Sequence, residues 1–250
     1  MSDTNTLSLL DDLIAFGDLK VWSVLVTLFG DMASAEGTYI AGPTLTLIAQ
    51  EIGIKPEALR VALHRLRKDG WLITDKNGRT SRHRLSPSAR TETLKAAGHI
   101  YAAEVPPAKG WSVVIPDPVT TDIPAEWLPV GPSAFLARDP SDDRGALVGT
   151  LSQGAVPAWV AARLVRPEIT MRYRALHGLL SGYPVPSDDR SPLARLTLRL
   201  LVLHHWRRTA LQHPADAAAL MGPDWSGALC RKLVHAWLTA LPKPDLQTLT

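Results

Sequence analysis

Apolar residues in the first third of the chain recur with helical spacing in three successive segments. A stripe in residues 19–32 predicts a helix with one buried face, and residues 45–52 predict a shorter second helix. Residues 56–69 predict a third helix, opened by proline and closed by Gly70. Between the first two helices, residues 38–40 predict a very short strand. The stripe of the first helix consists of Leu19, Trp22, Val26 and Phe29.

A β-hairpin is predicted directly after the third helix. Residues 71–75 and 79–85 are extended runs joined through Asn77-Gly78, and Asn-Gly favours a tight turn because both residues tolerate positive φ. Ser86-Pro87 then begins a helix that we expect to reach about residue 104. Helix, short strand, helix, turn, helix and hairpin is the order of a winged helix-turn-helix. We assign this fold to residues 1–104, with the hairpin as its wing.

Two further segments are predicted after a proline-containing linker at residues 105–110. Apolar runs of strand length with one helix predict a small central α+β module, of ferredoxin-like type, over residues 105–165. Residues 166–250 predict an all-α C-terminal domain, so the expected fold class is α+β with several domains. The predicted strands are 111–115, 133–137 and 146–151, and the predicted helices are 157–164, 168–180, 192–211 and 227–241.

The third helix carries the candidate chemistry. On a helical wheel, Leu59, Ala62, Leu63 and Leu66 lie on one side and are expected to face the core. The opposite side is basic and suits the roughly 12 Å wide major groove of DNA, where arginine binds guanine and valine contacts the thymine methyl. Arg67 lies nearer the flank and is expected at phosphate. The predicted DNA contacts of this helix are Lys55, Glu57, Arg60, Val61, His64, Arg65, Arg67 and Lys68.

The charge distribution supports the same interpretation. From residue 55 to residue 95, eleven basic residues stand against four acidic ones, an excess of seven positive charges, although the chain as a whole carries only +3. Residues 1–54 are acidic on balance. Such a concentration predicts phosphate binding that weakens with salt. The wing adds the basic residues Lys76, Arg79, Arg82, His83 and Arg84 beside Thr80 and Ser81. Of these we expect DNA contacts by Lys76, Arg79, Arg82 and Arg84.

Other features narrow the class of protein. The single cysteine, Cys230, excludes an intramolecular disulfide and is expected to be a buried structural thiol. The acidic N-terminus shows no secretory signal, and no apolar stretch is long enough to span a bilayer, so we expect a cytoplasmic protein with no membrane partner. His204-His205 does not have the three- or four-residue spacing of a helical metal site, and we expect no metal and no resident cofactor.

The C-terminal half leaves two alternatives open. Leu193, Leu196, Leu200 and Leu203, with Trp206 near the same stripe, are either a helix-pairing surface between two copies or an ordinary core face. Cations for an anionic effector are available on two predicted helices, but the sequence assigns none of them to a ligand. The first helix carries Arg172, Arg174 and His177, and the second carries His205, Arg207 and Arg208.

Two islands of sequence resemble the PaaX-like repressors, regulators of phenylacetate catabolism. The first comprises residues 26–31 (VTLFGD) and 59–72 (LRVALHRLRKDGWL), similar to the family's recognition helix and wing. The second, residues 223–227 (PDWSG) with Arg231, is similar to the family's Asp-Trp-Pro-Gly segment, although Ser226 stands where the family often has proline. The resemblance implies a homodimeric repressor of aromatic catabolism, released from DNA by an aryl-CoA thioester such as phenylacetyl-CoA.

The sequence therefore predicts a ligand-responsive regulator, not an enzyme, that binds double-stranded DNA. One alternative is a DNA-binding domain fused to an enzyme acting on a CoA or nucleotide substrate, although the sequence has no glycine-rich phosphate loop, nucleophile elbow or metal-ligand spacing. Another is a winged helix that docks on protein.

Overall fold

The computed structural model forms two compact units, each built from separate stretches of the chain. Unit 1 comprises Met1–Tyr101, Leu179–Arg207 and Leu233–Thr250, and unit 2 comprises Ala102–Gly178 and Arg208–Lys232. The three consecutive domains predicted from the sequence do not coincide with these units, and that division stays a prediction. The structure describes residues 2–78, 80–106, 110–138, 145–151, 156–186, 190–222 and 224–249, so Arg79, Pro223 and residues 107–109 of the predicted linker lie outside the described residues.

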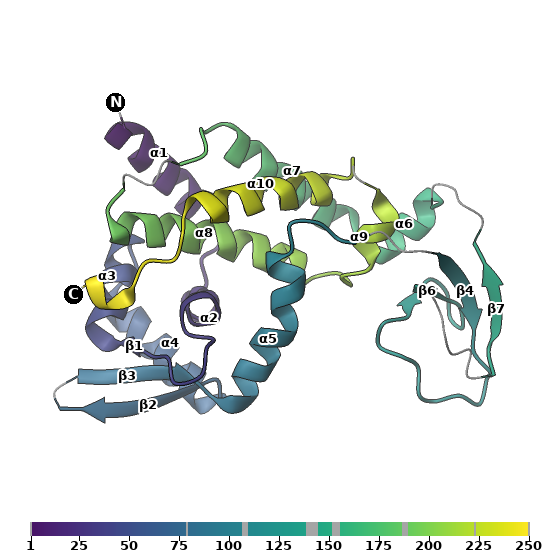
Figure 1. The fold of residues 1–250 in the computed structure, drawn as a ribbon, viewed down its shortest axis with the longest axis horizontal. Helices are drawn as coiled ribbons and strands as arrows, with labels where there is room; N and C mark the ends of the chain where they lie inside the picture. The colour runs from purple at the N-terminus through teal and green to yellow at the C-terminus, as the bar shows by residue number, and fades with distance from the viewer. Residues whose placement is uncertain are drawn as a thin grey trace. The chain divides into compact units, whose positions relative to one another are not determined.

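The N-terminal part of unit 1 has the element order that the sequence predicted, preceded by one helix that it did not (Figure 1). The additional helix is α1, whose acidic sequence shows a weak apolar pattern. The three strands of this part form one antiparallel sheet of order β1-β3-β2. The elements are α1 (Ser2–Ala15), α2 (Val21–Met32), β1 (Ile40–Ala41), α3 (Gly42–Glu51), α4 (Pro56–Lys68), β2 (Leu72–Asn77), β3 (Thr80–Leu85) and α5 (Pro87–Tyr101).

The hairpin is present, but its turn lies one residue later than predicted. Asn77 pairs with Thr80 and is the last residue of β2, so the turn begins at Gly78, whose φ is 60°. Leu72 and Leu85 form the pair at the other end and are both buried. Because a slip of one residue would turn both leucines to solvent, the buried pair fixes the register.

Helix α2 is buried differently from the prediction. Of the predicted stripe only Phe29 is fully buried, and Trp22 is 37% exposed. Ser23, Thr27 and Asp31 are buried instead, because α2 also packs against α8 (Pro192–Ala210), whose polar side chains bond to it. A helix with neighbours on two sides has no single apolar stripe that periodicity can detect.

In helix α8 the predicted stripe forms a core face from Leu196 onward, while Leu193 at its start is half-buried. Leu196, Leu200, Leu203 and Trp206 are each no more than 1% exposed, and the Trp206 Nε1 atom donates to the Ile100 carbonyl oxygen at 2.8 Å. A surface this fully buried within one chain is not available to a second copy.

The other helical elements follow the prediction, with two short additions. Helices α7 and α10 each contribute residues to both units, and α6 belongs to unit 2. The additions, α9 and η1, are too short for their apolar spacing to be recognised in the sequence. The elements are α6 (Ala158–Leu164), α7 (Pro167–Ser181), α9 (Ala217–Met221), α10 (Ser226–Ala240) and η1 (Leu246–Leu249).

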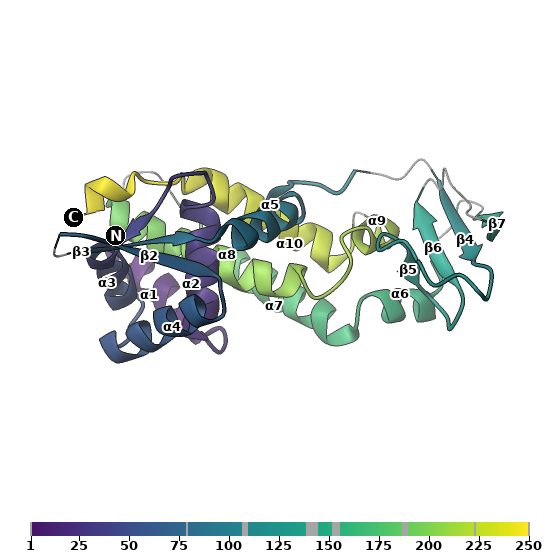
Figure 2. The ribbon, with the colours of Figure 1, turned by 90° about the horizontal axis from the view of Figure 1, so that it is seen from below.

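Unit 2 contains a four-stranded antiparallel sheet of order β5-β6-β4-β7 (Figure 2). Its core consists of Val114, Trp127 and Ala137. The four strands precede α6 without a helix between them in the described residues, which differs from the βαββαβ order of the predicted ferredoxin-like module. Prolines in the connections, such as Pro116 and Pro124, disfavour helices there. The strands are β4 (Trp111–Ile115), β5 (Leu128–Pro129), β6 (Phe135–Arg138) and β7 (Leu147–Thr150).

Two further observations concern the chain as a whole. No helix in the described part combines the length and apolarity needed to cross a bilayer.

Cys230 is fully buried, and burial raises the pKa of its thiol to about 12. The thiol is therefore protonated at neutral pH, as expected for a structural cysteine.

Candidate nucleic-acid interface

Helix α4 separates its apolar and basic residues onto opposite faces. Leu59, Ala62 and Leu66 are buried, while Leu63 lies half-buried at the margin of this face. Proline at the first helical position begins the helix, and Gly70, with φ 74°, ends it. All eight residues predicted to contact DNA from this segment are exposed, namely Lys55, Glu57, Arg60, Val61, His64, Arg65, Arg67 and Lys68.

The two central arginines of α4 are held by weak contacts within the protein. Arg60 Nη2 lies 3.3 Å from Glu57 Oε1, and Arg65 Nε lies 3.5 Å from Asp69 Oδ2. Both pairs are largely exposed, so water and salt screen them and they contribute little stability. The guanidinium groups can therefore exchange these partners for a nucleic-acid base or phosphate at small cost.

An aromatic residue that was predicted to lie in the core, Trp22, borders this face. The Arg65 guanidinium carbon lies 5.4 Å from the centroid of the Trp22 ring, within range of a cation–π contact. Trp22 was predicted to be buried because it follows Leu19 by three residues, the spacing of one helix face. No feature of the neighbouring sequence indicated that its side chain is exposed.

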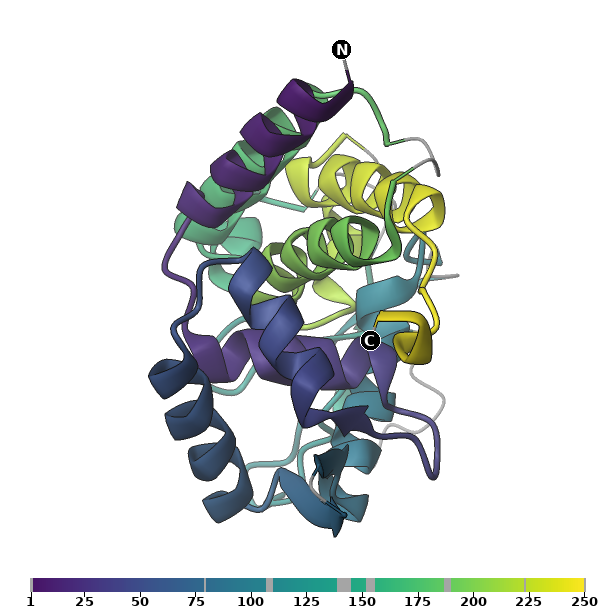
Figure 3. The same cartoon turned by 90° about the vertical axis from the view of Figure 1, so that its left-hand side faces the viewer.

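The hairpin lies beside α4 (Figures 1 and 3) and carries cations on both of its faces. In a strand, alternate residues share a face, so Arg82 and Arg84 lie on one side while Lys76, paired with Ser81, lies on the other. The Arg84 Nε atom donates to Asp75 Oδ2 at 3.1 Å. The Arg82 guanidinium carbon stands 4.2 Å from the Tyr39 ring centroid, a second aromatic contact that the sequence did not indicate.

His83 does not belong to the exposed surface of the hairpin, contrary to its expected place among the basic residues of the wing. It is 7% exposed, and its ring nitrogens lie within hydrogen-bond distance of the Thr74 and Ser81 hydroxyls, at 2.9 and 3.0 Å. Burial, reinforced by the charge of Arg67, lowers the pKa of His83 below 6.5. His83 is therefore a neutral structural residue at pH 7.

The cations considered for an anionic effector occupy different surroundings. His205 contacts the Leu13 carbonyl oxygen through Nε2 at 2.8 Å, and Arg207 donates from Nε to Thr27 Oγ1 at 3.0 Å, so both belong to the packing of unit 1. Arg172 and Arg174 are exposed on α7, and the Arg172 Nη1 atom donates to Gln212 Oε1.

The two islands of sequence that resemble the PaaX-like repressors have structural roles. In the first, Thr27 and Asp31 of α2 bond to Arg207 and Arg199 of α8. In the second, the Trp225 ring packs edge-on against Tyr173, with ring centroids 5.2 Å apart. A Cβ atom at Gly227 would overlap the Trp225 ring, which explains the glycine.

Comparison with known proteins finds similarity to the same family. Residues 20–89 match the family model described as PaaX-like protein, which covers α2 through the start of α5. The chain is also 26% identical over 246 residues to the transcriptional repressor PaaX of Escherichia coli strain K12, an alignment that covers 84% of this chain and 77% of that protein. The chain is thus similar to the PaaX-like proteins from α2 to the start of α5, and more loosely to one transcriptional repressor along most of its length.

Proposed function

We propose that this chain is a DNA-binding transcription regulator, and not an enzyme, whose segment from α2 to the β2–β3 hairpin is a winged helix-turn-helix. The observation that carries the proposal is the division of α4 into a buried leucine face and an exposed basic face beside the hairpin. Similarity to a transcriptional repressor supports repression as its mode of action.

In this proposal α4 enters the major groove of the duplex. Arg60 and Arg65 donate paired hydrogen bonds to guanine, while Val61, 69% exposed, contacts a thymine methyl. Because most of the Val61 side chain is exposed, its apolar surface is available for such a contact. The remaining cations of the helix and the wing, including Arg67, Lys68, Lys76, Arg79, Arg82 and Arg84, neutralise phosphates and set the register.

Dimerisation and ligand control are further parts of the proposal. A homodimer would read a palindromic operator, with one α4 in each half-site about one helical turn apart. An aryl-CoA thioester would act as the effector that releases the protein from DNA, and the protein would need no metal or resident cofactor. These parts are supported by the family resemblance.

Fluorescence anisotropy with a labelled duplex from the protein's own upstream region tests the proposal. We expect the chain to prefer this duplex to a scrambled one and to lose affinity steeply with added salt. In the variant Arg60→Ala/Arg65→Ala the preference should fall by about 1–3 kcal/mol for each lost base contact.

The matched control is Arg174→Ala, which removes an exposed helical arginine of unit 2. This variant should keep the full sequence preference. Equal binding of native and scrambled duplex by the unmodified chain would point to a protein-docking module instead. An unchanged preference in the double variant would show that α4 does not read the operator.

A further inference from the structure

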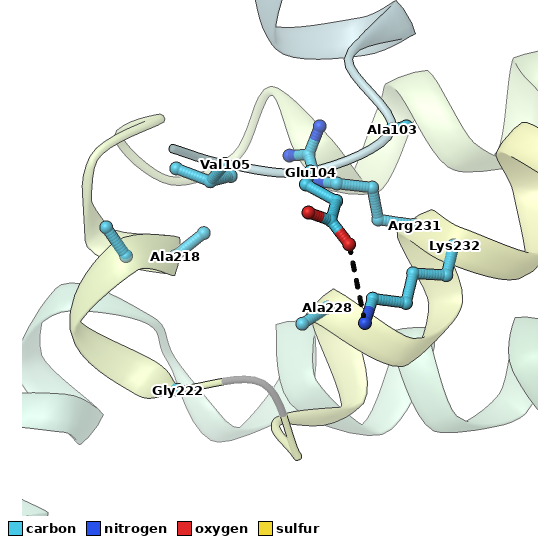
Figure 4. Close-up of a pocket in the computed structure, with 9 residues that line it drawn as sticks. Ala103, Glu104, Val105, Ala218, Gly222, Ala228, Arg231 and Lys232 are labelled. Carbon is cyan, nitrogen blue, oxygen red and sulfur yellow. Dashed lines mark ion pairs between the residues drawn. The ribbon is translucent and has the colours of Figure 1, made fainter. Parts of the chain in front are cut away.

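Unit 2 contains a cavity of about 240 Å³ with an apolar wall and a cationic wall. Figure 4 shows Ala218 and Gly222 on one side, Arg231 and Lys232 of α10 on the other, and the segment Ala103–Val105 passing across them. Ala219 and Ala228 complete the lining. The alanines and the glycine that line the cavity have small side chains or none, and this leaves the space open.

The cationic wall contains a buried guanidinium. Arg231 is only 4% exposed, and its Nη1 atom donates to the Ala102 carbonyl oxygen at 3.1 Å, which fixes the side chain at the cavity. Burial lowers the pKa of Arg231, meaning that its charged form is poorly solvated there. Arginine suits a carboxylate because the two planar groups can share two hydrogen bonds.

The cavity already holds one carboxylate, which belongs to the chain. Glu104 points toward Lys232, and Oε1 lies 3.6 Å from Nζ. The side chains of Lys232 and Glu104 are 55% and 72% exposed, so this pair is weak and easily separated. A carboxylate that binds Lys232 would therefore have to displace Glu104.

We propose that this cavity binds a small monocarboxylate with a compact apolar body, which lies against the alanines while its carboxylate displaces Glu104 at the cationic wall. The volume accommodates a small acid and is below the range of about 300–1,000 Å³ typical of sites for larger ligands. A whole CoA thioester does not fit in it. The inference concerns ligand binding to unit 2 and does not depend on the proposed DNA binding.

Isothermal titration calorimetry of the full chain without DNA tests the site. The probes are butyrate and benzoate, their uncharged amides, and inorganic phosphate as a different anion. We expect the two carboxylates to bind at least ten times more tightly than the amides and phosphate. Glu104→Gln should tighten carboxylate binding several-fold because it removes the internal competitor.

Two variants should weaken binding by different routes. Lys232→Gln removes an exposed cation and should weaken carboxylates about tenfold, equivalent to 1.4 kcal/mol. Ala228→Leu fills the cavity and should abolish binding. The control Arg163→Gln removes an exposed arginine of α6, outside the cavity lining, and should bind like the unmodified chain.

Three results would overturn the proposal. The first is the absence of any binding heat when butyrate or benzoate is titrated to about 10 mM into the unmodified chain and into Glu104→Gln. The second is equal binding of carboxylates and amides. The third is unchanged affinity in Ala228→Leu, with the variant's melting temperature verifying that it is folded. Binding of the labelled duplex is measured separately on the same proteins, and it tests the proposed DNA-binding function independently of carboxylate binding.

Discussion

His83 is held in an environment that disfavours its charged form. It is enclosed in the small sheet, opposite Ile40 on β1, and both ring nitrogens are close to hydroxyl groups. Burial and the nearby charge of Arg67 lower its pKa in the folded state below 6.5. The unfolded chain therefore binds a proton more readily than the folded one as the pH falls. The stability that neutral His83 contributes is complete above about pH 6.5 and is lost as the pH decreases toward the folded-state pKa.

We expect the melting temperature, followed by circular dichroism, to fall when the pH is lowered from about 7.5 to 5.5. His83→Gln removes the titrating group while keeping a polar side chain between Thr74 and Ser81. This variant should be less stable at pH 7.5, and its melting temperature should fall less over the same interval. A parallel decline in the two proteins would assign the pH dependence to other histidines.

At the scale of elements, a buried ion pair joins α2 to α8. The Arg199 Nε atom donates to Asp31 Oδ2 at 2.6 Å, and its Nη1 donates to the carbonyl oxygens of Leu238 and Leu241, both at 2.8 Å. Lys243 Nζ lies 3.2 Å from Asp31 Oδ1. Burial alone would raise the pKa of Asp31, but the hydrogen bonds and charge of Arg199, together with Lys243 and Tyr101, outweigh it and hold the pKa below 3.8. The carboxylate therefore contributes stability above pH 3.8, which is lost at lower pH.

Replacing Asp31 by asparagine should destabilise the chain by about 3–5 kcal/mol, because it leaves the buried guanidinium of Arg199 without its carboxylate. Urea unfolding followed by circular dichroism measures the loss. The matched control is Glu36→Gln, which removes an exposed carboxylate paired with Arg90 and should cost at most about 1 kcal/mol. Similar losses in the two variants would mean that the α2–α8 ion pair contributes no more than a surface contact.

Elements with local signals could be predicted from sequence, whereas those defined by distant contacts could not. Proline and glycine delimit α4, and its alternation of leucine and arginine predicted which face is exposed. The Asn-Gly pair located the hairpin, but its register depends on the cross-strand pair Leu72 and Leu85. Trp22 was misplaced because α8, far along the chain, covers the opposite side of α2. The cavity of unit 2 combines residues 103–105 with residues from the stretch 218–232, far along the chain, and no spacing rule relates the two.

At the scale of the whole molecule, unit 1 is discontinuous in sequence. Its N-terminal stretch packs with Leu179–Arg207 and Leu233–Thr250, and the contacts include polar groups that are buried. Arg199 binds Asp31, Trp206 donates to the Ile100 carbonyl, and Lys243 Nζ donates to the Asp31 carbonyl oxygen at 2.6 Å. The predicted DNA-binding segment, residues 1–104, thus contains a carboxylate and a helix face that are buried only when the later stretches are present.

We therefore predict that a fragment of residues 1–104 will not fold as the same segment does in the full chain. Without α8 the apolar and polar residues on the covered side of α2 face water, and Asp31 loses Arg199 and Lys243, so the fragment keeps too little buried surface for a cooperative fold. Near-ultraviolet circular dichroism should show weak tertiary signals, and heating should give a broad transition, whereas the full chain should melt sharply. A sharp transition of the fragment within a few degrees of the full chain would show that residues 1–104 are an autonomous domain. In that case the contacts of α2 with α8 join two independently stable parts and do not complete one core.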